Sequence, residues 1–244
     1  MITATKTSKT TSIPYNHQSW EMRRKLCRFL LNTIAFPWLV KLDRVEGIEN
    51  IPAQGSAILL INHIAFVDPI VVLHIMPRNI VPLAKIEVYE YPIVGIFPRI
   101  WGVIPVRRNE VDRIAISKAI DVLNAGEIIL VAPEGTRNDE LQRGREGIAY
   151  LASRTGSPVI PVALENTCGY PTYPFSKRWR QEGASVRIGR PFCYSVEYAN
   201  ARMKLLRKMT DEAMYILAKM LPENRRGVYS DLSEATMETI KWCE

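Results

Sequence analysis

The fold class of this chain follows from residues 56–69, which read SAILLINHIAFVDP. The first half is a run rich in isoleucine and leucine, and it predicts a buried strand over 56–62. Pro69 indicates a helix start, because proline is tolerated in the first helical turn, and the helical pattern continues over 69–77. A buried strand that leads directly into a helix is the repeating unit of an α/β domain.

The same alternation recurs along the chain. Further buried strands are predicted at 80–84, 101–106, 127–133 and 157–164, and further helices at 110–126 and 144–156. We therefore expect an α/β fold with a largely parallel central sheet flanked by helices. The 244 residues, 47% of them hydrophobic, are sufficient for one large domain with a substantial core.

Changes in composition divide the chain into four parts. Residues 1–20 are predicted to be a polar tail, 21–44 a basic amphipathic helical segment, and 45–200 the α/β domain. Residues 201–244 read as a long amphipathic helix followed by a polar, loosely ordered tail. One more strand is expected within 184–192.

The excess of positive charge is concentrated at the N-terminus. The formal net charge is +7, and residues 1–44, with eight Lys and Arg against two Asp and Glu, contribute +6. Residues 45–200 are neutral, and 201–244 contribute +1. A nucleic-acid-binding domain spreads its basic residues over a recognition surface, and the sequence contains neither a zinc finger nor an RNP-like aromatic motif. The distribution predicts a basic anchor on a neutral body and no nucleic acid partner.

The anchor candidate is the stretch MRRKLCRFLLNTIAFPWLVKL, residues 22–42. Its cations precede its apolar part and are Arg23, Arg24, Lys25 and Arg28. The apolar part contains Phe29, Leu30, Leu31, Ile34, Phe36, Trp38 and Leu39. One interpretation is a helix that lies in a membrane interface with its cations toward anionic headgroups. The other is a helix packed on the body of the protein, and in both cases Pro37 kinks or ends the first helix.

The chain has four cysteines, Cys27, Cys168, Cys193 and Cys243, and no two of them have CxxC spacing. This argues against a disulfide framework and a zinc site, and it favours a reducing compartment. No apolar stretch approaches the ~18 uninterrupted residues of a spanning helix. The first twenty residues lack a signal-peptide core. We expect a peripheral protein at the cytoplasmic face of a membrane.

Of the three histidines, His63 stands where a catalytic base is expected. It follows the opening strand, and sites in open α/β sheets form at the carboxyl ends of strands. Asp68, five residues later, can hold one ring nitrogen and leave the other to accept a proton. His17 lies in the polar tail, and His74 lies in the apolar helix predicted over 69–77, where a packing role is expected. The alternative for His63 and Asp68 is an ordinary turn and helix start.

Two further strand ends carry groups that suit an anion. VAPEGTRN (131–138) contains a turn whose backbone N–H groups and guanidinium can bind one, and GVIPVRR (102–108) ends in two arginines. Either loop alone has a simpler interpretation as a solvated turn, but three strand ends with a base, an anion turn and cations indicate one site. The loops GxGxxG and GxxxxGKS/T and the serine elbow GxSxG are absent. We therefore expect chemistry without a covalent serine intermediate.

These motifs resemble the PlsC-type glycerolipid acyltransferases, the 1-acyl-sn-glycerol-3-phosphate acyltransferases. NHIAFVD resembles their HxxxxD block, with His63 and Asp68 as the dyad. The connector AKIEVYEYPIVG, which contains Lys85, is also similar. The other three blocks match WG with IPVRR (Arg107), PEGTR (Glu134, Gly135, Thr136 and Arg137) and VIPVAL (Pro161). All four blocks occur in order between residue 56 and about 165.

The resemblance implies transfer of a fatty acyl group from acyl-CoA or acyl-carrier protein to the hydroxyl of lysophosphatidic acid, which gives phosphatidic acid. His63 would act as the general base and Asp68 would orient it. The acceptor phosphate would be bound by Arg107, Glu134, Gly135, Thr136 and Arg137. Glu134 would also hold an arginine in position, and Pro161 would shape the acyl-donor region. Neither a cofactor nor a metal is implied, and the expected partners include a membrane surface with anionic lipids.

The chain departs from the family pattern near the dyad. Ala65 stands where a serine is common, Ile64 replaces the usual polar residue after the histidine, and Asn138 stands where serine is frequent. One alternative is therefore an acyltransferase for a different lysolipid or an amine-bearing acceptor. Another, from a different class, is a catalytically decayed membrane-bound lipid-binding protein, against which the presence of both dyad residues argues.

Overall fold

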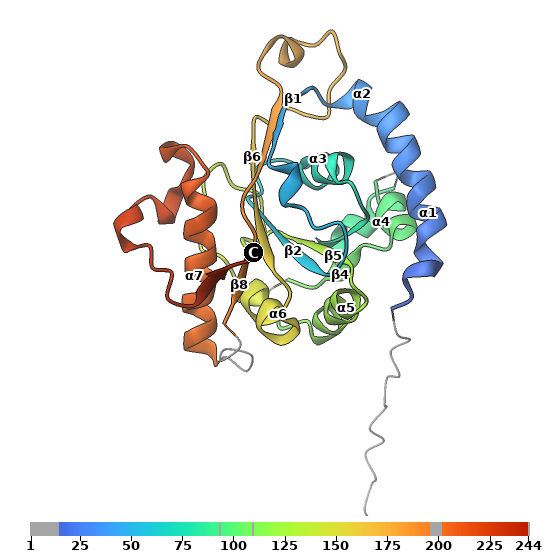
Figure 1. Ribbon diagram of the computed structural model, residues 1–244. Helices are drawn as coiled ribbons and strands as arrows, with labels where there is room; N and C mark the ends of the chain where they lie inside the picture. The colour runs from blue at the N-terminus through green and yellow to red at the C-terminus, as the bar shows by residue number, and fades with distance from the viewer. Residues whose placement is uncertain (1–14, 93, 109, 196–201, 244) are drawn as a thin grey trace, which may run out of the picture.

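The computed structural model describes residues 15–92, 94–108, 110–195 and 202–243. Within them, nine strands form one mixed sheet with helices on both faces (Figure 1). The strands are β1 (Leu42–Glu46), β2 (Ala57–Ile61), β3 (Ile80–Lys85), β4 (Ile104–Val106), β5 (Ile128–Val131), β6 (Val159–Glu165), β7 (Ala184–Ile188), β8 (Phe192–Tyr194) and β9 (Ile240–Trp242). The helices are α1 (His17–Leu30), α2 (Phe36–Leu39), α3 (Asp68–Ile75), α4 (Ile96–Trp101), α5 (Arg113–Asn124), α6 (Gly147–Thr155) and α7 (Met203–Lys219).

The sheet runs in the order β1-β7-β6-β2-β5-β3-β4, with β8 beside β6 and β9 beside β8. All neighbours from β6 to β4 are parallel, so the predicted parallel sheet is confirmed for these five strands. The sheet as a whole is mixed, because β7 and β8 are antiparallel to β6. Two consecutive strands can run parallel only if a crossover of a dozen or more residues, usually an α-helix, connects them. The segment between β6 and β7 holds only a short 3-10 turn, Lys177–Arg180, and the chain comes back antiparallel.

Two hydrophobic cores cover the two faces of the sheet. Alternate β2 residues Ala57, Leu59 and Ile61 belong to the core that α1–α4 cover, and Ile58 and Leu60 belong to the core that α5–α7 cover. Figure 1 shows α1 and α7 on opposite sides of the sheet. All five β2 side chains are buried, which explains why its sequence is an unbroken apolar run rather than an alternating one.

Three parts of the chain differ from the expectation. Trp101 and Gly102 end helix α4 instead of starting a strand, with Gly102 in the left-handed conformation that a helix end often requires (φ +76°). The edge strand β1 was not predicted, because LDRVE is polar and largely exposed. The residues after α7 are ordered through 243, since Leu221 and Tyr229 are buried and β9 pairs with β8.

Helix α1 begins at His17, inside the stretch expected to be a polar tail, and one of its faces packs on the domain. Arg24 is 0% exposed, and its Nε donates to the Trp101 carbonyl at 2.9 Å. Arg28 is half-buried and donates to the Arg78 carbonyl at 2.6 Å. Of the two interpretations of this segment, the one that turns Arg24 and Arg28 toward headgroups is wrong for these two residues, because both donate to backbone carbonyls of the domain. No helix in the described ranges is long and apolar enough to cross a membrane.

The expectation of no disulfide is also corrected. Cys193 on β8 and Cys243 just after β9 form a disulfide with Cα atoms 6.1 Å apart. The two residues are 50 positions apart in the sequence, and they meet only because β8 and β9 pair antiparallel. CxxC spacing could not reveal such a pair.

Candidate active site

The candidate site lies where β2, β5 and β6 end, because these parallel neighbours have their carboxyl ends at the same edge of the sheet. Asn62, the residue after β2, pairs through its side chain with the backbone of Leu164 in β6. Its amide nitrogen donates to the Leu164 carbonyl at 2.9 Å, and its amide oxygen accepts from the Leu164 N–H at 2.8 Å. This pair fixes the end of β2 against β6 and so fixes the direction in which His63 leaves the strand.

His63 and Asp68 are in direct contact, as the sequence predicted. His63 Nδ1 lies 2.8 Å from Asp68 Oδ2, and the same oxygen accepts the backbone N–H groups of Ile64 at 2.7 Å and Ala65 at 2.8 Å. Because two backbone donors already point at Oδ2, the ring must donate to it through Nδ1–H. Nε2 is thereby left as a proton acceptor on a side chain that is 18% exposed.

The second oxygen of Asp68 is held by a residue outside the four sequence blocks. Thr167 donates its hydroxyl to Asp68 Oδ1 at 2.5 Å, and both residues are 0% exposed. The carboxylate therefore receives hydrogen bonds at both oxygens, which offsets the cost of burying a charge.

The PEGTR turn and Asn138, the residue after it, hold the backbone of His63 through its N–H and its carbonyl. Glu134 Oε1 accepts the His63 N–H at 3.4 Å, and the His63 carbonyl accepts the Asn138 N–H at 2.9 Å. The other Glu134 oxygen accepts the Gln142 N–H at 2.8 Å. Burial raises the pKa of Glu134, and these amide hydrogen bonds offset part of that rise. Glu134 was expected to hold an arginine, and it holds the backbone of the dyad loop instead.

Gly135 makes the tight turn possible. Its φ is +71°, and its N–H donates to the Ala132 carbonyl at 3.1 Å. Thr136 and Arg137 follow on the exposed side of the turn. The Arg137 side chain is exposed, and no hydrogen bond or ion pair with another described residue holds it.

Arg107 and Pro161 lie further from the dyad. Arg107 follows β4, and β5 and β3 separate β4 from β2, so its exposed side chain lies along the same edge of the sheet. Its backbone N–H donates to Asp112 at 2.9 Å, which fixes the start of the loop. Pro161 is buried inside β6 opposite Leu60, on the face that α7 covers, and its acyl-donor role stays a prediction.

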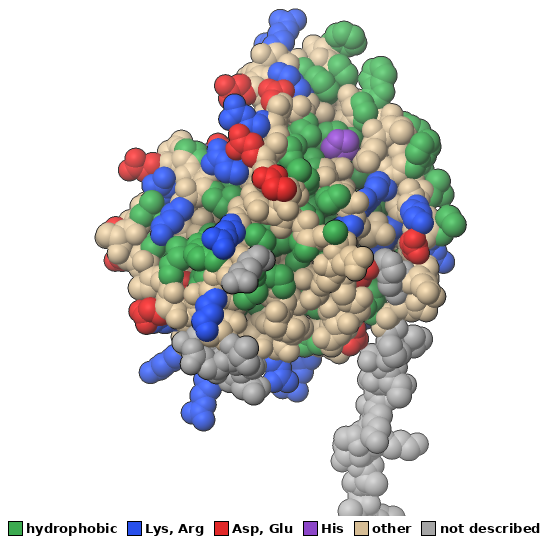
Figure 2. All heavy atoms as spheres, viewed as in Figure 1, with side chains coloured by type: hydrophobic (Ala, Val, Ile, Leu, Met, Phe, Trp, Pro, Cys, Tyr) green, Lys and Arg blue, Asp and Glu red, His purple; other side chains and the backbone are tan. Residues whose placement is uncertain are grey.

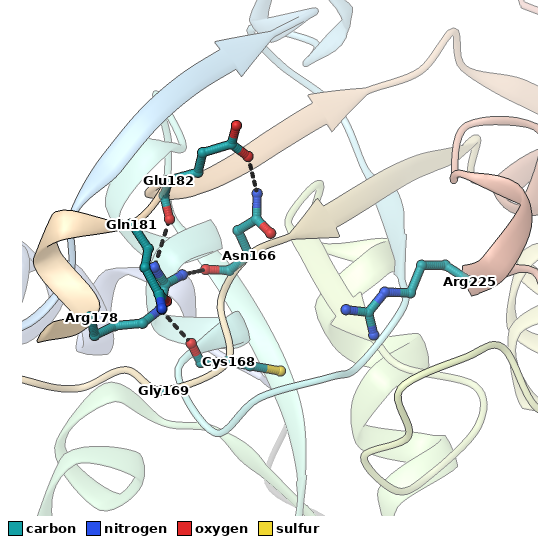
Figure 3. Close-up of a pocket in the computed structure, with 7 residues that line it drawn as sticks. All are labelled: Asn166, Cys168, Gly169, Arg178, Gln181, Glu182 and Arg225. Atoms are coloured by element: carbon teal, nitrogen blue, oxygen red, sulfur yellow. Dashed lines mark hydrogen bonds between the residues drawn. The ribbon is translucent and has the colours of Figure 1, made fainter.

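A surface pocket of about 560 Å³ adjoins the dyad loop (Figure 3). It is lined by polar residues for the most part: Asn166, Cys168, Gly169, Arg178, Gln181, Glu182 and Arg225. The Cys168 thiol contacts the Ile64 carbonyl at 3.7 Å, which connects the pocket to the dyad. Burial raises the pKa of Cys168, so the thiol is not an activated nucleophile. A pocket of this chemistry suits a polar part of a substrate.

His74 has the packing role that the sequence predicted. Its ring stacks on Phe36 with centroids 3.6 Å apart, and Nδ1 lies 2.9 Å from Asn32 Oδ1. Burial lowers the pKa of His74, which keeps the ring neutral. In the ranges that the structure covers, no group of three or more His, Cys, Asp and Glu side chains could hold a metal ion.

The sequence did not predict the roles of three residues, Asn62, Thr167 and Arg178. Asn62 stands at the start of the NHIAFVD block, but it is uncharged and no role was assigned to it. Thr167 is uncharged and belongs to no block, and Arg178 lies in a loop that reads as solvated. One signal could have found Thr167: it follows β6, and β6 ends at the same edge as β2.

Comparisons with known proteins show which family this sequence resembles. A family model described as Acyltransferase matches residues 43–165. A 1-acyl-sn-glycerol-3-phosphate acyltransferase of Borreliella burgdorferi is 37% identical over 127 residues, which cover 50% of this chain and 51% of that protein. One of Bacillus subtilis is 29% identical over 123 residues, covering 50% and 62%. This chain thus spans about half the length of the first of these relatives.

A solved structure shares the fold. The 1-acyl-sn-glycerophosphate (LPA) acyltransferase PlsC from Thermotoga maritima superposes with a TM-score of 0.54 at 24% identity, covering 79% of this chain and 78% of that one. At this level of identity the likeness concerns the fold alone.

Proposed function

The chain belongs to the acyltransferase family, and on that premise we propose that it acylates 1-acyl-glycerol-3-phosphate to give phosphatidic acid. The acyl donor in this proposal is a thioester, either acyl-CoA or acyl-carrier protein. The named relatives from Borreliella burgdorferi and Bacillus subtilis support the choice of acceptor.

The observation that carries the proposal is the contact of His63 with Asp68. The ring is held through Nδ1, so Nε2 is the atom that can take a proton from a bound hydroxyl. Nε2 of His63 removes the proton of the acceptor hydroxyl while that oxygen attacks the thioester carbonyl carbon. The tetrahedral intermediate collapses, the carbon–sulfur bond breaks, and His63 returns the proton to the departing thiolate. The products are phosphatidic acid and a free thiol, and no acyl-enzyme forms.

We assign recognition of the acceptor phosphate to the PEGTR turn and to Arg107. Arg137 is exposed and unpaired in the described part of the chain, and a guanidinium forms strong, charge-assisted hydrogen bonds with phosphate. The backbone amides around Gly135 and the Thr136 hydroxyl supply further donors. Glu134 contributes indirectly, because it fixes the backbone of His63. Pro161 is kept as part of the acyl-donor region.

We further propose that α1 and α2 hold the protein peripherally at the cytoplasmic face of a membrane that contains anionic lipids. The outer face of this segment exposes Met22, Leu26, Phe29, Leu30, Ile34, Trp38 and Leu39. Figure 2 shows hydrophobic side chains gathered along this flank of the molecule. An apolar face this long favours burial at the boundary between headgroups and acyl chains. Arg23 and Lys25 remain exposed for anionic headgroups, and Lys25 also pairs with Glu21 at 2.7 Å.

The direct test supplies the purified protein with one acceptor and one donor at a time. Lysophosphatidic acid is compared with neutral and zwitterionic lysolipids, each with acyl-CoA and with acyl-carrier protein, and thiol release and lipid product are measured. We expect turnover with lysophosphatidic acid to exceed that with every other lysolipid. Preference for a lysolipid without a terminal phosphate would overturn the assigned acceptor. Binding of lysolipid with no thiol release from any donor would favour a lipid-binding protein.

A further inference from the structure

We propose that Thr167 is a positioning residue for the catalytic dyad, holding the Asp68 carboxylate in the orientation that fixes the tautomer of His63. The proposal deepens the proposed function, since it concerns the same site. Thr167 touches no substrate in this account. It acts on the reaction through Asp68 alone.

The hydrogen bonds of Asp68 make this role specific. Its Oδ2 receives three donors, from His63 Nδ1 and the N–H groups of Ile64 and Ala65. Its Oδ1 receives one donor in the described structure, the Thr167 hydroxyl. Without that hydroxyl, Oδ1 would be a buried acceptor with no partner, and the carboxyl group would rotate toward another donor to relieve the cost. Such a rotation displaces Oδ2, the acceptor that selects the Nδ1–H form of His63.

The backbone around Thr167 is built to hold this side chain in place. Asn166 adopts a left-handed conformation (φ 57°) directly after β6, which turns Thr167 inward. The Arg178 guanidinium donates to the carbonyls of Asn166 and Cys168, the two neighbours of Thr167 in the chain, and its NH1 donates to the Glu182 carbonyl at 2.6 Å (Figure 3). Arg178 also lies 4.3 Å from the centroid of the Tyr170 ring. Because the backbone is held on both sides of Thr167, its buried hydroxyl stays oriented to donate to Asp68 Oδ1.

The kinetic test compares three substitutions at one position. Thr167→Val keeps the shape and removes the hydroxyl, Thr167→Ser restores it, and Thr167→Ala is a second hydroxyl-free variant in case valine impairs folding. We expect the hydroxyl-free variants to lose about 10- to 100-fold in kcat, as expected when a catalytic group is misplaced. KM for both substrates should change little, and Thr167→Ser should recover most of the loss. Normal kcat in a folded hydroxyl-free variant would overturn the proposal.

Two controls separate positioning from general destabilisation. Thr210 is equally buried, and its hydroxyl donates to the Leu206 carbonyl within α7, so Thr210→Val removes a buried hydroxyl outside the site. We expect parental kcat for Thr210→Val. If Thr167 acts through Asp68, adding Thr167→Val to Asp68→Asn should cost almost nothing more. Fully additive losses would contradict the proposal.

A spectroscopic measurement tests the same point without substrates. In protein labelled with ¹⁵N-histidine, two-bond ¹H–¹⁵N correlations report which ring nitrogen is protonated, and His63→Ala identifies the His63 signals. At a pH where the ring is neutral, we expect the Nδ1–H form of His63 in the parent and in Thr167→Ser, and a mixture in Thr167→Val. An unchanged tautomer in Thr167→Val would overturn the proposal. The two proposals can fail separately. If Thr167→Val shifts the His63 tautomer but the parent protein transfers no acyl group, the proposed function fails and the positioning role stands.

Discussion

The Nε atom of Arg24 donates a hydrogen bond of 2.9 Å to the Trp101 carbonyl, and the Arg24 side chain is completely buried. This contact fixes helix α1 to the end of α4. Gly102, the next residue, packs so closely on Trp20 that a Cβ atom there would come within 2.8 Å of the indole ring. The polar face of the N-terminal helix is therefore a docking face for the domain, and the apolar face points outward.

Exposed apolar residues of α1 and α2 should dominate membrane binding. Phe29 and Trp38 are each 61% exposed, and full burial of such side chains contributes about 1.5–3 kcal/mol each. We expect Phe29→Ser combined with Trp38→Ser to weaken co-sedimentation with anionic vesicles at least tenfold, largely independently of salt. Activity on detergent-dispersed acceptor should be retained.

The matched control for that experiment lies on the opposite side of the sheet. Met203 and Val228 are 67% and 58% exposed, and the pair Met203→Ser and Val228→Ser should bind vesicles as the parent does. Equal losses in the two double variants would show that the α1–α2 face is not the membrane contact.

Arg137 and Arg107 should act on the acceptor more than on the donor. We expect Arg137→Ala or Arg107→Ala to raise KM for lysophosphatidic acid about tenfold, because a charge-assisted hydrogen bond to phosphate is lost. KM for the acyl donor should change much less. Arg154→Ala, at the C-terminal end of α6, is the control for loss of one positive charge. Parallel changes in both KM values would indicate structural arginines.

Glu212 makes the stability of the C-terminal segment depend on pH. Burial alone would raise the pKa of Glu212, but hydrogen bonds from Thr236, Glu238 and Thr239 outweigh it and hold the pKa below its ordinary value of 4.5. A lowered carboxyl pKa stabilises the fold above the unfolded value, and that contribution is lost as pH falls through the folded value.

Glu212→Gln should therefore lower Tm at pH 7. Hydrogen bonds to a charged group contribute about 1.5–3 kcal/mol, and each kcal/mol shifts Tm by roughly 2–4 °C at this size. The difference from the parent should shrink as pH falls below about 4.5 in thermal melts. Glu223→Gln, at an exposed position, should melt as the parent does. A Glu212→Gln deficit that persists unchanged in acid would contradict the assignment.

The sequence predicted the parts of the fold and the site that depend on local patterns. Strand β2 reads as one apolar run, and His63 and Asp68 are five residues apart, so the strand, the following helix and the dyad were all predictable. Thr167 meets Asp68 across 99 positions, and no local pattern reports that contact. The amphipathic pattern of α1 identified an apolar face and a basic face. It could not decide which face packs on the domain, because an arginine can satisfy a buried carbonyl as Arg24 does.

The most direct measurement is the rate of phosphatidic acid formation by the parent and by His63→Ala, with the fold of both checked by circular dichroism. Asp68→Asn serves as the graded comparison, since a misoriented ring can still accept a proton on occasion. We predict a loss of about 10²–10⁴ in rate for His63→Ala, and a smaller but severe loss for Asp68→Asn. Near-normal turnover by a folded His63→Ala protein would contradict the account.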